Sequence, residues 1–375
     1  MTSPSKPSPA FVELTPGDPA PWFHQRSTRN PSYAFDMAAG RYIVLCFYAT
    51  AADEQGRAAI EGVLAHRHYF DDDHFSFFGV SLDPKDEAER RVGESLPGIR
   101  FFWDFNGRVS RLYGAIAKGA ETVNMSVSTE VRRFWVVLDP TLRVLLVVPF
   151  ALDGSDTARL FADLEQLPPP DRFTGVEIQA PILFLPNVLE LELCRRLIDL
   201  HQCHGGAESG FMRDVDGKTT EFQDHNHKRR RDYLVEDPDL VHGLEARLVR
   251  CLYPELLKAY SFKATHIERH LIGCYSADEG GHFRMHRDNT TRGTAHRRFA
   301  VSINLNSGFE GGALSFPEYG PRRFSPPAGG AVVFPCALLH AVSPVTKGRR
   351  YAFLPFLYDD EAAKLREANS LFFDK

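Results

Sequence analysis

Three consecutive prolines, Pro168 to Pro170, divide this chain of 375 residues into two parts of different character. Proline has a fixed φ and no backbone N–H, so a run of prolines cannot continue a helix and forms a stiff, extended spacer. The length also exceeds the usual size of one domain, and each part is long enough to bury its own core. The sequence therefore predicts two domains, residues 15–167 and 176–375, with a proline-rich linker at 168–175 and a disordered tail at 1–14.

The part before the prolines alternates strand-like and helix-like segments. Apolar runs of strand length are followed by segments with helical spacing, which is typical of an α/β layer with parallel or mixed strands. The predicted strands are 41–49, 75–82, 134–139 and 142–149, and the predicted helices are 53–67, 85–94 and 155–166.

The part after the prolines opens with a short apolar strand, 180–186, continues with helical segments and then changes to short strands separated by Gly and Pro turns. This second pattern is typical of a closed or double-sheet all-β fold. The predicted helices are 189–201 and 237–260, the latter broken near Pro254, and the clearest predicted strands are 266–275, 297–306, 313–316, 331–334 and 350–358. The polar segment 205–232 has no periodicity and is predicted to be loop.

Two residues of the second part, His286 and Asp288, stand two positions apart. Side chains at positions i and i+2 of a strand point to the same side, so this pair can hold one metal ion, with His340 as a third ligand from another strand. Two imidazoles and one carboxylate are the set that leaves half of the coordination sphere of Fe(II) open. Arg350, ten residues after His340, adds a guanidinium suited to bidentate binding of a carboxylate, whereas Arg349 faces the other side of the strand.

From about Thr265 to Asp360 the chain resembles the 2-oxoglutarate- and Fe(II)-dependent dioxygenases, and among them the prolyl 4-hydroxylase-like branch. The residues that carry the resemblance are Tyr275, His286-Arg287-Asp288-Asn289, Ser302 to Asn306, Phe309 to Gly312, Phe316-Pro317, Pro327 to Phe334 and His340 to Tyr351. The resemblance implies a double-stranded β-helix, or jelly-roll, in which His286, Asp288 and His340 bind Fe(II). It also implies 2-oxoglutarate and O2 as cosubstrates, with Arg350 on the distal carboxylate of 2-oxoglutarate and Tyr275 as a hydroxyl donor to it.

Between Thr15 and Gln166 the chain resembles the peroxiredoxins, a variant of the thioredoxin fold. The matching stretches are Gly17 to Pro21, Val44 to Tyr48, Gly79 to Asp83, Asp104 to Gly107, Tyr113-Gly114 and Val137 to Pro140. A peroxiredoxin needs a reactive thiolate in the turn after Phe47-Tyr48, but residues 49–54 contain no cysteine. Cys46 lies inside the predicted strand, and either Arg132 or Arg133 matches the arginine of that family. We therefore expect a domain that serves packing or recognition.

Composition narrows the expected partners and compartment. Lysine and arginine total 44 and aspartate and glutamate total 49, a net charge of −5 without a long basic stripe, so nucleic acid is not an expected partner. No apolar run approaches the ~18–20 residues of a membrane span, so no membrane association is expected. The six cysteines are scattered without a C-x-x-C pair, which is typical of reduced thiols in a cytoplasmic protein.

The predicted fold class is α+β, with a thioredoxin-like α/β domain followed by a jelly-roll with supporting helices. The expected function is that of a dioxygenase that hydroxylates a C–H bond of a protein, peptide or amino-acid-like small molecule and releases succinate and CO2. The alternatives are a non-catalytic sensor or adaptor for oxygen or 2-oxoglutarate, and a peroxidase acting through the first domain, against which the missing thiolate argues. The substrate, the type and position of oxidation, the oligomeric state and the role of the first domain stay open. The loop with His225 and His227 also stays open between a lid edge, a substrate contact and a second metal site.

Overall fold

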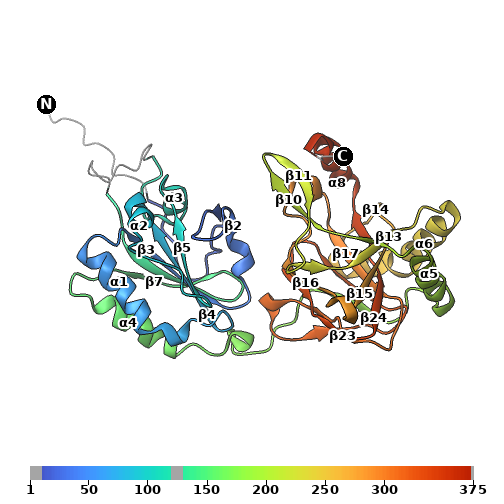
Figure 1. Ribbon diagram of the computed structural model, residues 1–375, viewed down its shortest axis with the longest axis horizontal. Helices are drawn as coiled ribbons and strands as arrows, with labels where there is room; N and C mark the ends of the chain where they lie inside the picture. Colours follow the sequence, from blue (N-terminus) through green and yellow to red (C-terminus); the bar gives the residue numbers. More distant parts are fainter. Residues whose placement is uncertain (1–10, 120–129, 373–375) are drawn as a thin grey trace. The chain divides into compact units, whose positions relative to one another are not determined.

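The computed structural model of the protein describes residues 11–119 and 130–372 (Figure 1). Residues 1–10 of the predicted tail lie outside the described residues. The chain divides into two compact units, the first ending at Gln179 and the second beginning at Ala180, with Pro317–Gly320 counted with the first. The proline-rich stretch contains a short 3-10 helix, Pro170–Arg172. The domain limits predicted at 15–167 and 176–375 stay predictions.

The first unit is built on a five-stranded mixed sheet. Its strand order is β5 (Ile99–Trp103), β4 (Phe75–Ser81), β3 (Tyr42–Ala49), β6 (Phe134–Leu138) and β7 (Val144–Pro149). The β3–β4 and β4–β5 pairs are parallel, and the β3–β6 and β6–β7 pairs are antiparallel. All eight residues of β3 are buried, which explains why its sequence is a continuous apolar run without alternation. A two-stranded ladder, β1 (His24–Gln25) with β2 (Tyr33–Ala34), is also present.

Both faces of this sheet are covered. The helices of the unit are α1 (Glu54–Ala65), α2 (Pro84–Ala88), α3 (Arg108–Tyr113) and α4 (Ser155–Glu165). Apolar side chains of α1 and α4 share one core with the Tyr42, Val44, Cys46 and Tyr48 face of β3. The predicted elements are present, although α2 ends early, because Arg90 has a φ of +53° that no helix accommodates. Strand β5 and helix α3 were not predicted.

The second unit contains two larger sheets. The nine-stranded sheet runs β14 (His266–Glu268), β25 (Phe356–Tyr358), β17 (Phe299–Asn304), β24 (Arg349–Phe353), β15 (Leu271–Ser276), β13 (Arg231–Leu234), β9 (Ala207–Glu208), with β21 (Ala331–Pro335) pairing both β17 and β8 (Leu183–Leu185). The five-stranded sheet runs β12 (Lys228–Arg229), β16 (His282–His286), β22 (His340–Val342), β19 (Leu314–Ser315), β20 (Arg323–Phe324). A short ladder joins β18 (Glu310–Gly311) to β23 (Val345–Lys347). This is the predicted two-sheet architecture, and the predicted fold class of the chain is confirmed.

Helices support the larger sheet from outside. They are α5 (Leu191–His204), α6 (Pro238–Cys251) and α7 (Tyr253–Tyr260), and α8 (Asp360–Ala368) follows the last strand. Leucines of α5, α6 and α7 form one core with apolar residues of β15, β17, β21 and β24. Burial of each such side chain contributes about 1.5–3 kcal/mol. The break between α6 and α7 falls at Leu252, two residues before Pro254, as expected.

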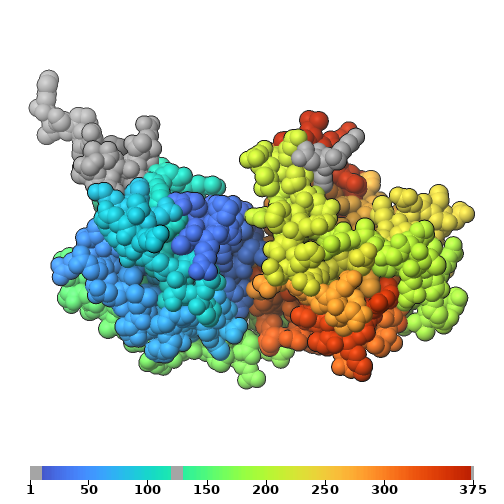
Figure 2. Space-filling model, in the orientation of Figure 1, coloured from blue at the N-terminus to red at the C-terminus, as the bar shows by residue number. Residues whose placement is uncertain are grey.

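The prediction of a loop over 205–232 is wrong. This segment contains a hairpin of β10 (Phe211–Val215) and β11 (Lys218–Phe222), and it also supplies β9, β12 and the start of β13. The hairpin turn is Asp216-Gly217, with φ values of +50° and +81°, the backbone that Asp-Gly favours in a two-residue hairpin. Figure 2 shows this yellow-green hairpin standing out on the surface of the second unit. Much of it is exposed, so its sequence lacks the apolar alternation of a half-buried strand, and the Asp-Gly pair was the signal that could have revealed it.

Candidate metal centre

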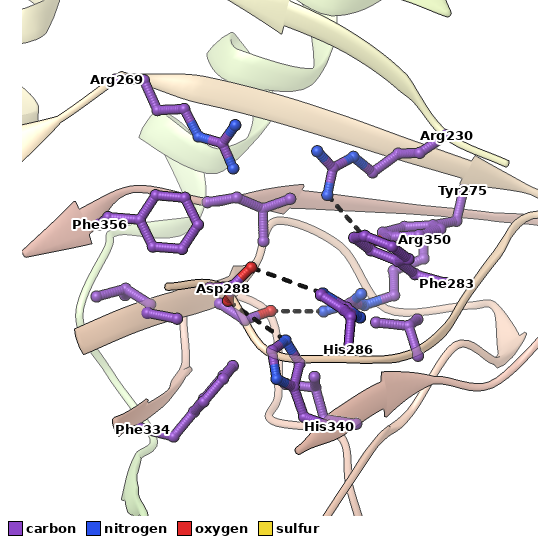
Figure 3. A pocket seen from close by; sticks show the side chains of 16 residues that line it. Arg230, Arg269, Tyr275, Phe283, His286, Asp288, Phe334, His340, Arg350 and Phe356 are labelled. Carbon is purple, nitrogen blue, oxygen red and sulfur yellow. Dashed lines mark hydrogen bonds and ion pairs between the residues drawn. The ribbon is translucent and has the colours of Figure 1, made fainter. Parts of the chain in front are cut away.

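The three predicted metal ligands come together at the end of two paired strands. His286 is the last residue of β16 and lies opposite His340, the first residue of β22, in the antiparallel register. Asp288 follows two residues later, where its backbone N–H donates to the carbonyl of Cys336 at 2.9 Å. One ligand atom from each of the three side chains lies within 4.8 Å of the other two (Figure 3). The alternation and long-range pairing expected from the sequence therefore produce a compact His-Asp-His group.

Backbone carbonyls determine which nitrogen of each imidazole is free. Nδ1 of His286 lies 2.7 Å from the carbonyl oxygen of Arg284, and Nδ1 of His340 lies 3.0 Å from that of Leu338. A carbonyl oxygen can only accept, so Nδ1 carries the hydrogen in both rings and Nε2 keeps a lone pair. Hydrogen bonding of the remote nitrogen is the arrangement that orients histidine ligands of metals.

The free nitrogens face the carboxylate of Asp288. Nε2 of His286 is 3.6 Å from Oδ1, and Nε2 of His340 is 3.4 Å from Oδ2. Burial lowers the pKa of His286 well below its usual value, and the neighbouring His340 lowers it further, so this ring is neutral at pH 7. The Nε2 lone pairs of both rings therefore point at the carboxylate oxygens of Asp288, an arrangement that a cation between them stabilises. Ligand atoms at right angles around a metal, with bonds near 2.1 Å, are about 3 Å apart, so the residues fit a divalent metal with small adjustments.

Arg350 lines the same cavity from the larger sheet. It is 2% exposed, and its guanidinium donates from Nε to Oδ1 of Asn304 at 2.9 Å and from Nη2 to Oγ of Ser302 at 2.8 Å. It has no carboxylate partner among the residues that the structure describes, and burial lowers its pKa from the ordinary value. Arg349 is exposed and lies 3.6 Å from Asp278, so the two arginines face opposite sides of β24 as expected. A buried, unpaired guanidinium fits an incoming carboxylate.

Tyr275 lies directly opposite Arg350 in the register of β15 and β24. The Arg350 guanidinium is 5.4 Å from the centre of its ring, and its hydroxyl accepts a hydrogen bond at 3.3 Å from Nη1 of Arg230. Arg230 is buried and paired in turn with Asp232. The structure therefore places Tyr275 and Arg350 side by side and adds Arg230, which the sequence showed only as part of a basic run.

The cavity around these groups has apolar walls. It has an empty volume of about 450 Å³, including space open to solvent. The Phe283 ring stacks on His286 with centroids 3.5 Å apart, and Phe334 packs against His340 at 4.6 Å. The remaining apolar lining residues are Ala300, Val301, Leu314, Val342, Leu354 and Phe356. Such walls exclude water from the metal ligands and strengthen electrostatic interactions with a bound molecule.

His225 and His227, for which the sequence left three roles open, have different surroundings. His225 is largely exposed, and its Nδ1 lies 3.0 Å from Glu208. The His227 ring packs near Phe211, Phe283 and His286, with centroid distances of 4.3, 5.6 and 6.4 Å, and burial lowers its pKa to about 4. Within residues 11–119 and 130–372, the only cluster of side chains that could bind a metal ion consists of His286, Asp288 and His340. His227 therefore packs next to the site, against Phe283 and His286, and is not part of that group.

In the first unit, the turn after β3 holds carboxylates where a peroxiredoxin has its thiolate. Asp53 caps α1 by accepting from the N–H of Gly56 and forms an ion pair with Arg133, so of the two candidate arginines Arg133 faces this turn. Cys46 is completely buried in β3, and burial raises the pKa of its thiol well above the usual value. A protonated, inaccessible thiol is not a nucleophile, and the arginine already has an anionic partner.

Comparison with known proteins agrees with both sequence resemblances. Residues 271–358 match the 2OG-Fe(II) oxygenase superfamily, and residues 16–144 match the AhpC/TSA family, which is peroxiredoxin-like. The second unit thus contains a stretch that matches the 2OG-Fe(II) oxygenases, and in this chain it follows a thioredoxin-fold unit that is similar to the AhpC/TSA family. This superfamily implies Fe(II), 2-oxoglutarate and O2, as predicted.

Two curated relatives are similar to part of the chain. A PKHD-type hydroxylase of Pseudomonas fluorescens is 40% identical over 91 residues, which cover 22% of this chain and 39% of the relative. The PKHD-type hydroxylase PiuC of Pseudomonas aeruginosa is 29% identical over 147 residues, which cover 37% of this chain and 64% of the relative. The chain therefore spans less than two thirds of the length of either relative.

Solved structures resemble each unit at low identity. A prolyl hydroxylase from Trichoplax adhaerens, solved with a peptide of hypoxia inducible factor, has a TM-score of 0.38 and 16% identity, with 51% of this chain and 87% of that chain covered. A yeast mitochondrial 1-Cys peroxiredoxin has a TM-score of 0.36 and 19% identity, with 41% of this chain and 76% of that chain covered.

Two further expectations concern thiols and membranes. All six cysteines are free, four of them buried, and Cys203 is exposed. Among the described residues, no helix has the length and apolar character needed to cross a membrane.

Proposed function

We propose that the protein is an Fe(II)- and 2-oxoglutarate-dependent dioxygenase that hydroxylates a C–H bond of a protein, peptide or amino-acid-like substrate and releases succinate and CO2. The observation that carries the proposal is that one cavity holds both a His-Asp-His group and a buried guanidinium without a carboxylate partner among the described residues. A site for a metal alone has no need of the guanidinium, whereas a site for a metal and a dicarboxylate needs both. The match to the 2OG-Fe(II) oxygenase superfamily and the PKHD-type hydroxylase relatives support the same class.

In this proposal His286, Asp288 and His340 would hold Fe(II), which would supply the activation of O2 that a protein side chain cannot provide. Asp288 provides the only carboxylate of the ligand set. The carbonyls of Arg284 and Leu338 accept from Nδ1 of His286 and His340 and so leave both Nε2 atoms free for the metal.

Arg350 and Tyr275 position the cosubstrate. The Arg350 fork binds the distal carboxylate of 2-oxoglutarate, Ser302 and Asn304 hold the fork in place, and Tyr275 adds its hydroxyl. The aromatic and aliphatic walls keep water away from the reacting groups. The free thiols support a reducing, cytoplasmic place of action.

The test is succinate formation by the full-length protein with Fe(II), 2-oxoglutarate and air. We expect succinate from the parent, loss of succinate with Asp288→Ala, and parent-like succinate with Asp278→Ala, which removes an exposed carboxylate. Metal titration and thermal denaturation show whether the loss follows from metal binding or from unfolding. No iron-dependent succinate from the parent would favour the non-catalytic sensor or adaptor, and parent-like succinate from Asp288→Ala would contradict the ligand assignment.

A further inference from the structure

One cationic residue of the cavity has no role in the proposed function. Arg269 lies in the two-residue link between β14 and β15 and lines the cavity (Figure 3). Its guanidinium lies over the Phe356 ring at 4.6 Å, and its Nε is closed off from solvent without a hydrogen-bond partner. Among the residues that the structure describes, no carboxylate forms an ion pair with it.

The neighbouring acids are already occupied. Glu268 accepts hydrogen bonds from His296 at 2.8 Å and from Arg297 at 2.8 and 2.5 Å. Asp232 accepts from Arg230 at 2.5 and 2.6 Å. Burial is the main cause that lowers the pKa of Arg269, and the positive charges of Arg297 and Arg230 act in the same direction. The resulting pKa is about 10, so the group still carries its charge at pH 7. A partly buried cation without a counter-ion is unfavourable unless a ligand supplies one.

The backbone of Arg269 is also strained. Its φ is +52°, in the left-handed region that residues with a Cβ rarely adopt. Such conformations cost about 1–3 kcal/mol and are concentrated at binding and catalytic sites. The strain and the unpaired guanidinium occur in the same residue, at the cavity wall.

The charges of the proposed iron and cosubstrate balance without Arg269. Fe(II) has two positive charges and Arg350 one, while Asp288 has one negative charge and 2-oxoglutarate two, so this set is neutral. Arg230 and Asp232 neutralise each other. The positive charge of Arg269 stays uncompensated after the metal and the cosubstrate are bound. A single spare cation matches a monoanion such as a carboxylate, and a guanidinium fork matches its two oxygens.

We propose that Arg269 binds a carboxylate of the primary substrate, so that the oxidised molecule is an acid held by this group beside the metal. The inference rests on the proposed function, because it takes Arg350 as the partner of 2-oxoglutarate. The carboxylate belongs either to the terminal acid of a small molecule or to an acidic side chain of a peptide. Both sources present the same chemistry to Arg269.

The experiment uses the full-length protein loaded with Mn(II) and saturating N-oxalylglycine, an unreactive analogue of 2-oxoglutarate. Three probes are titrated: N-acetylalanine with a terminal carboxylate, N-acetylaspartic acid α-amide with a side-chain carboxylate, and the uncharged N-acetylalaninamide. Paramagnetic relaxation of their acetyl protons reports binding near the metal. We expect at least one acid to bind about ten- to a hundredfold more tightly than the amide, and the better acid identifies the source of the carboxylate.

Two variants show whether Arg269 causes the preference for acids over the amide. Arg269→Gln should abolish it, whereas Arg292→Gln should retain it, since Arg292 lies over Phe372 at a similar 4.8 Å but is not among the residues lining the cavity. Equal binding of acids and amide by the parent would overturn the inference, as would a preference that survives Arg269→Gln. The comparison on the parent decides the question even when Arg269→Gln does not fold. Binding of Mn(II) and N-oxalylglycine by the parent is measured before any probe is added. If the parent binds neither, the proposed function is overturned, and the inference with it.

Discussion

Replacing Arg350 by alanine separates cosubstrate binding from metal binding. In the parent, Nε and Nη2 of Arg350 each donate one hydrogen bond, to Asn304 and Ser302. A guanidinium has five N–H groups, so three are left for a bound carboxylate. Arg350 is not part of the His-Asp-His group. We therefore expect Arg350→Ala to weaken the binding of 2-oxoglutarate and to leave the affinity for Fe(II) nearly unchanged.

The size of the effect follows from burial and charge. Arg350 is only 2% exposed, so solvent screens its interaction with a carboxylate weakly. A hydrogen bond to a charged group contributes roughly 1.5–3 kcal/mol, which corresponds to about ten- to a hundredfold in the dissociation constant. Arg350→Lys keeps the charge but loses the planar fork, and it should fall between the parent and Arg350→Ala. Arg349→Ala removes an exposed charge beside Asp278 and should change the dissociation constant little.

Anaerobic titration of the iron-loaded protein with 2-oxoglutarate measures these constants through the visible absorption of the iron–oxo acid complex. A separate Fe(II) titration and a thermal denaturation curve show that each variant is folded and binds metal. The reasoning is refuted if Arg349→Ala weakens 2-oxoglutarate binding more than Arg350→Ala does. It is equally refuted by an Arg350→Ala protein whose dissociation constant for 2-oxoglutarate matches that of the parent.

Four further predictions follow from the structure. Asp288→Asn places an amide N–H donor beside the Nε2 lone pairs of His286 and His340, so the metal-free protein should melt about 2–4 °C higher, and metal binding should be lost. A lower melting temperature of the metal-free variant would contradict the geometry. The buried thiol of Cys46 should stay reduced in hydrogen peroxide, as peptide mass spectrometry will show, and peroxide consumption at a peroxiredoxin-like rate would contradict our interpretation of the first unit. The fragment 167–375 should bind Mn(II) as tightly as the whole chain, because every residue lining the cavity belongs to the second unit; a folded fragment without metal affinity would refute this. Burial alone would raise the pKa of Asp72, but hydrogen bonds, chiefly from Arg100, lower it to about 2. The contribution of Asp72 to the free energy of unfolding is therefore present above about pH 4 and is lost as the pH falls toward 2. Asp72→Asn should lower the free energy of unfolding by about 2 kcal/mol at pH 7 and make it less dependent on pH between about 4 and 2, and an unchanged pH dependence would exclude the effect.

The geometry of the His-Asp-His group was accessible from sequence because it depends on simple rules. The spacing of two residues brings His286, at the end of β16, and Asp288, in the turn that follows, to one side, and His340 of a distant strand supplies the third side chain. Strand alternation separates Arg350 from Arg349. These features are local or involve one strand pairing, and the structure shows all of them.

The remaining wall of the site could not be predicted in this way. Arg230 reaches the cavity because β13 pairs with β15, and this pairing follows a hairpin that has no apolar alternation. Arg269 reaches it because its backbone adopts a positive φ between two strands, a conformation that no sequence pattern around an arginine indicates. Whether a polar residue faces solvent or a cavity depends on such long-range contacts, and the residue types are the same in both cases.

Oxygen-isotope transfer tests the central claim most directly. The full-length protein, loaded with Fe(II) and 2-oxoglutarate, is allowed to react under 18O2 in a cell extract, and succinate and products are analysed by mass spectrometry. Our account predicts succinate with one 18O atom and a product that gains one 18O atom, both absent with Asp288→Ala. Succinate without 18O, or labelled succinate that forms equally well with Asp288→Ala, would contradict it.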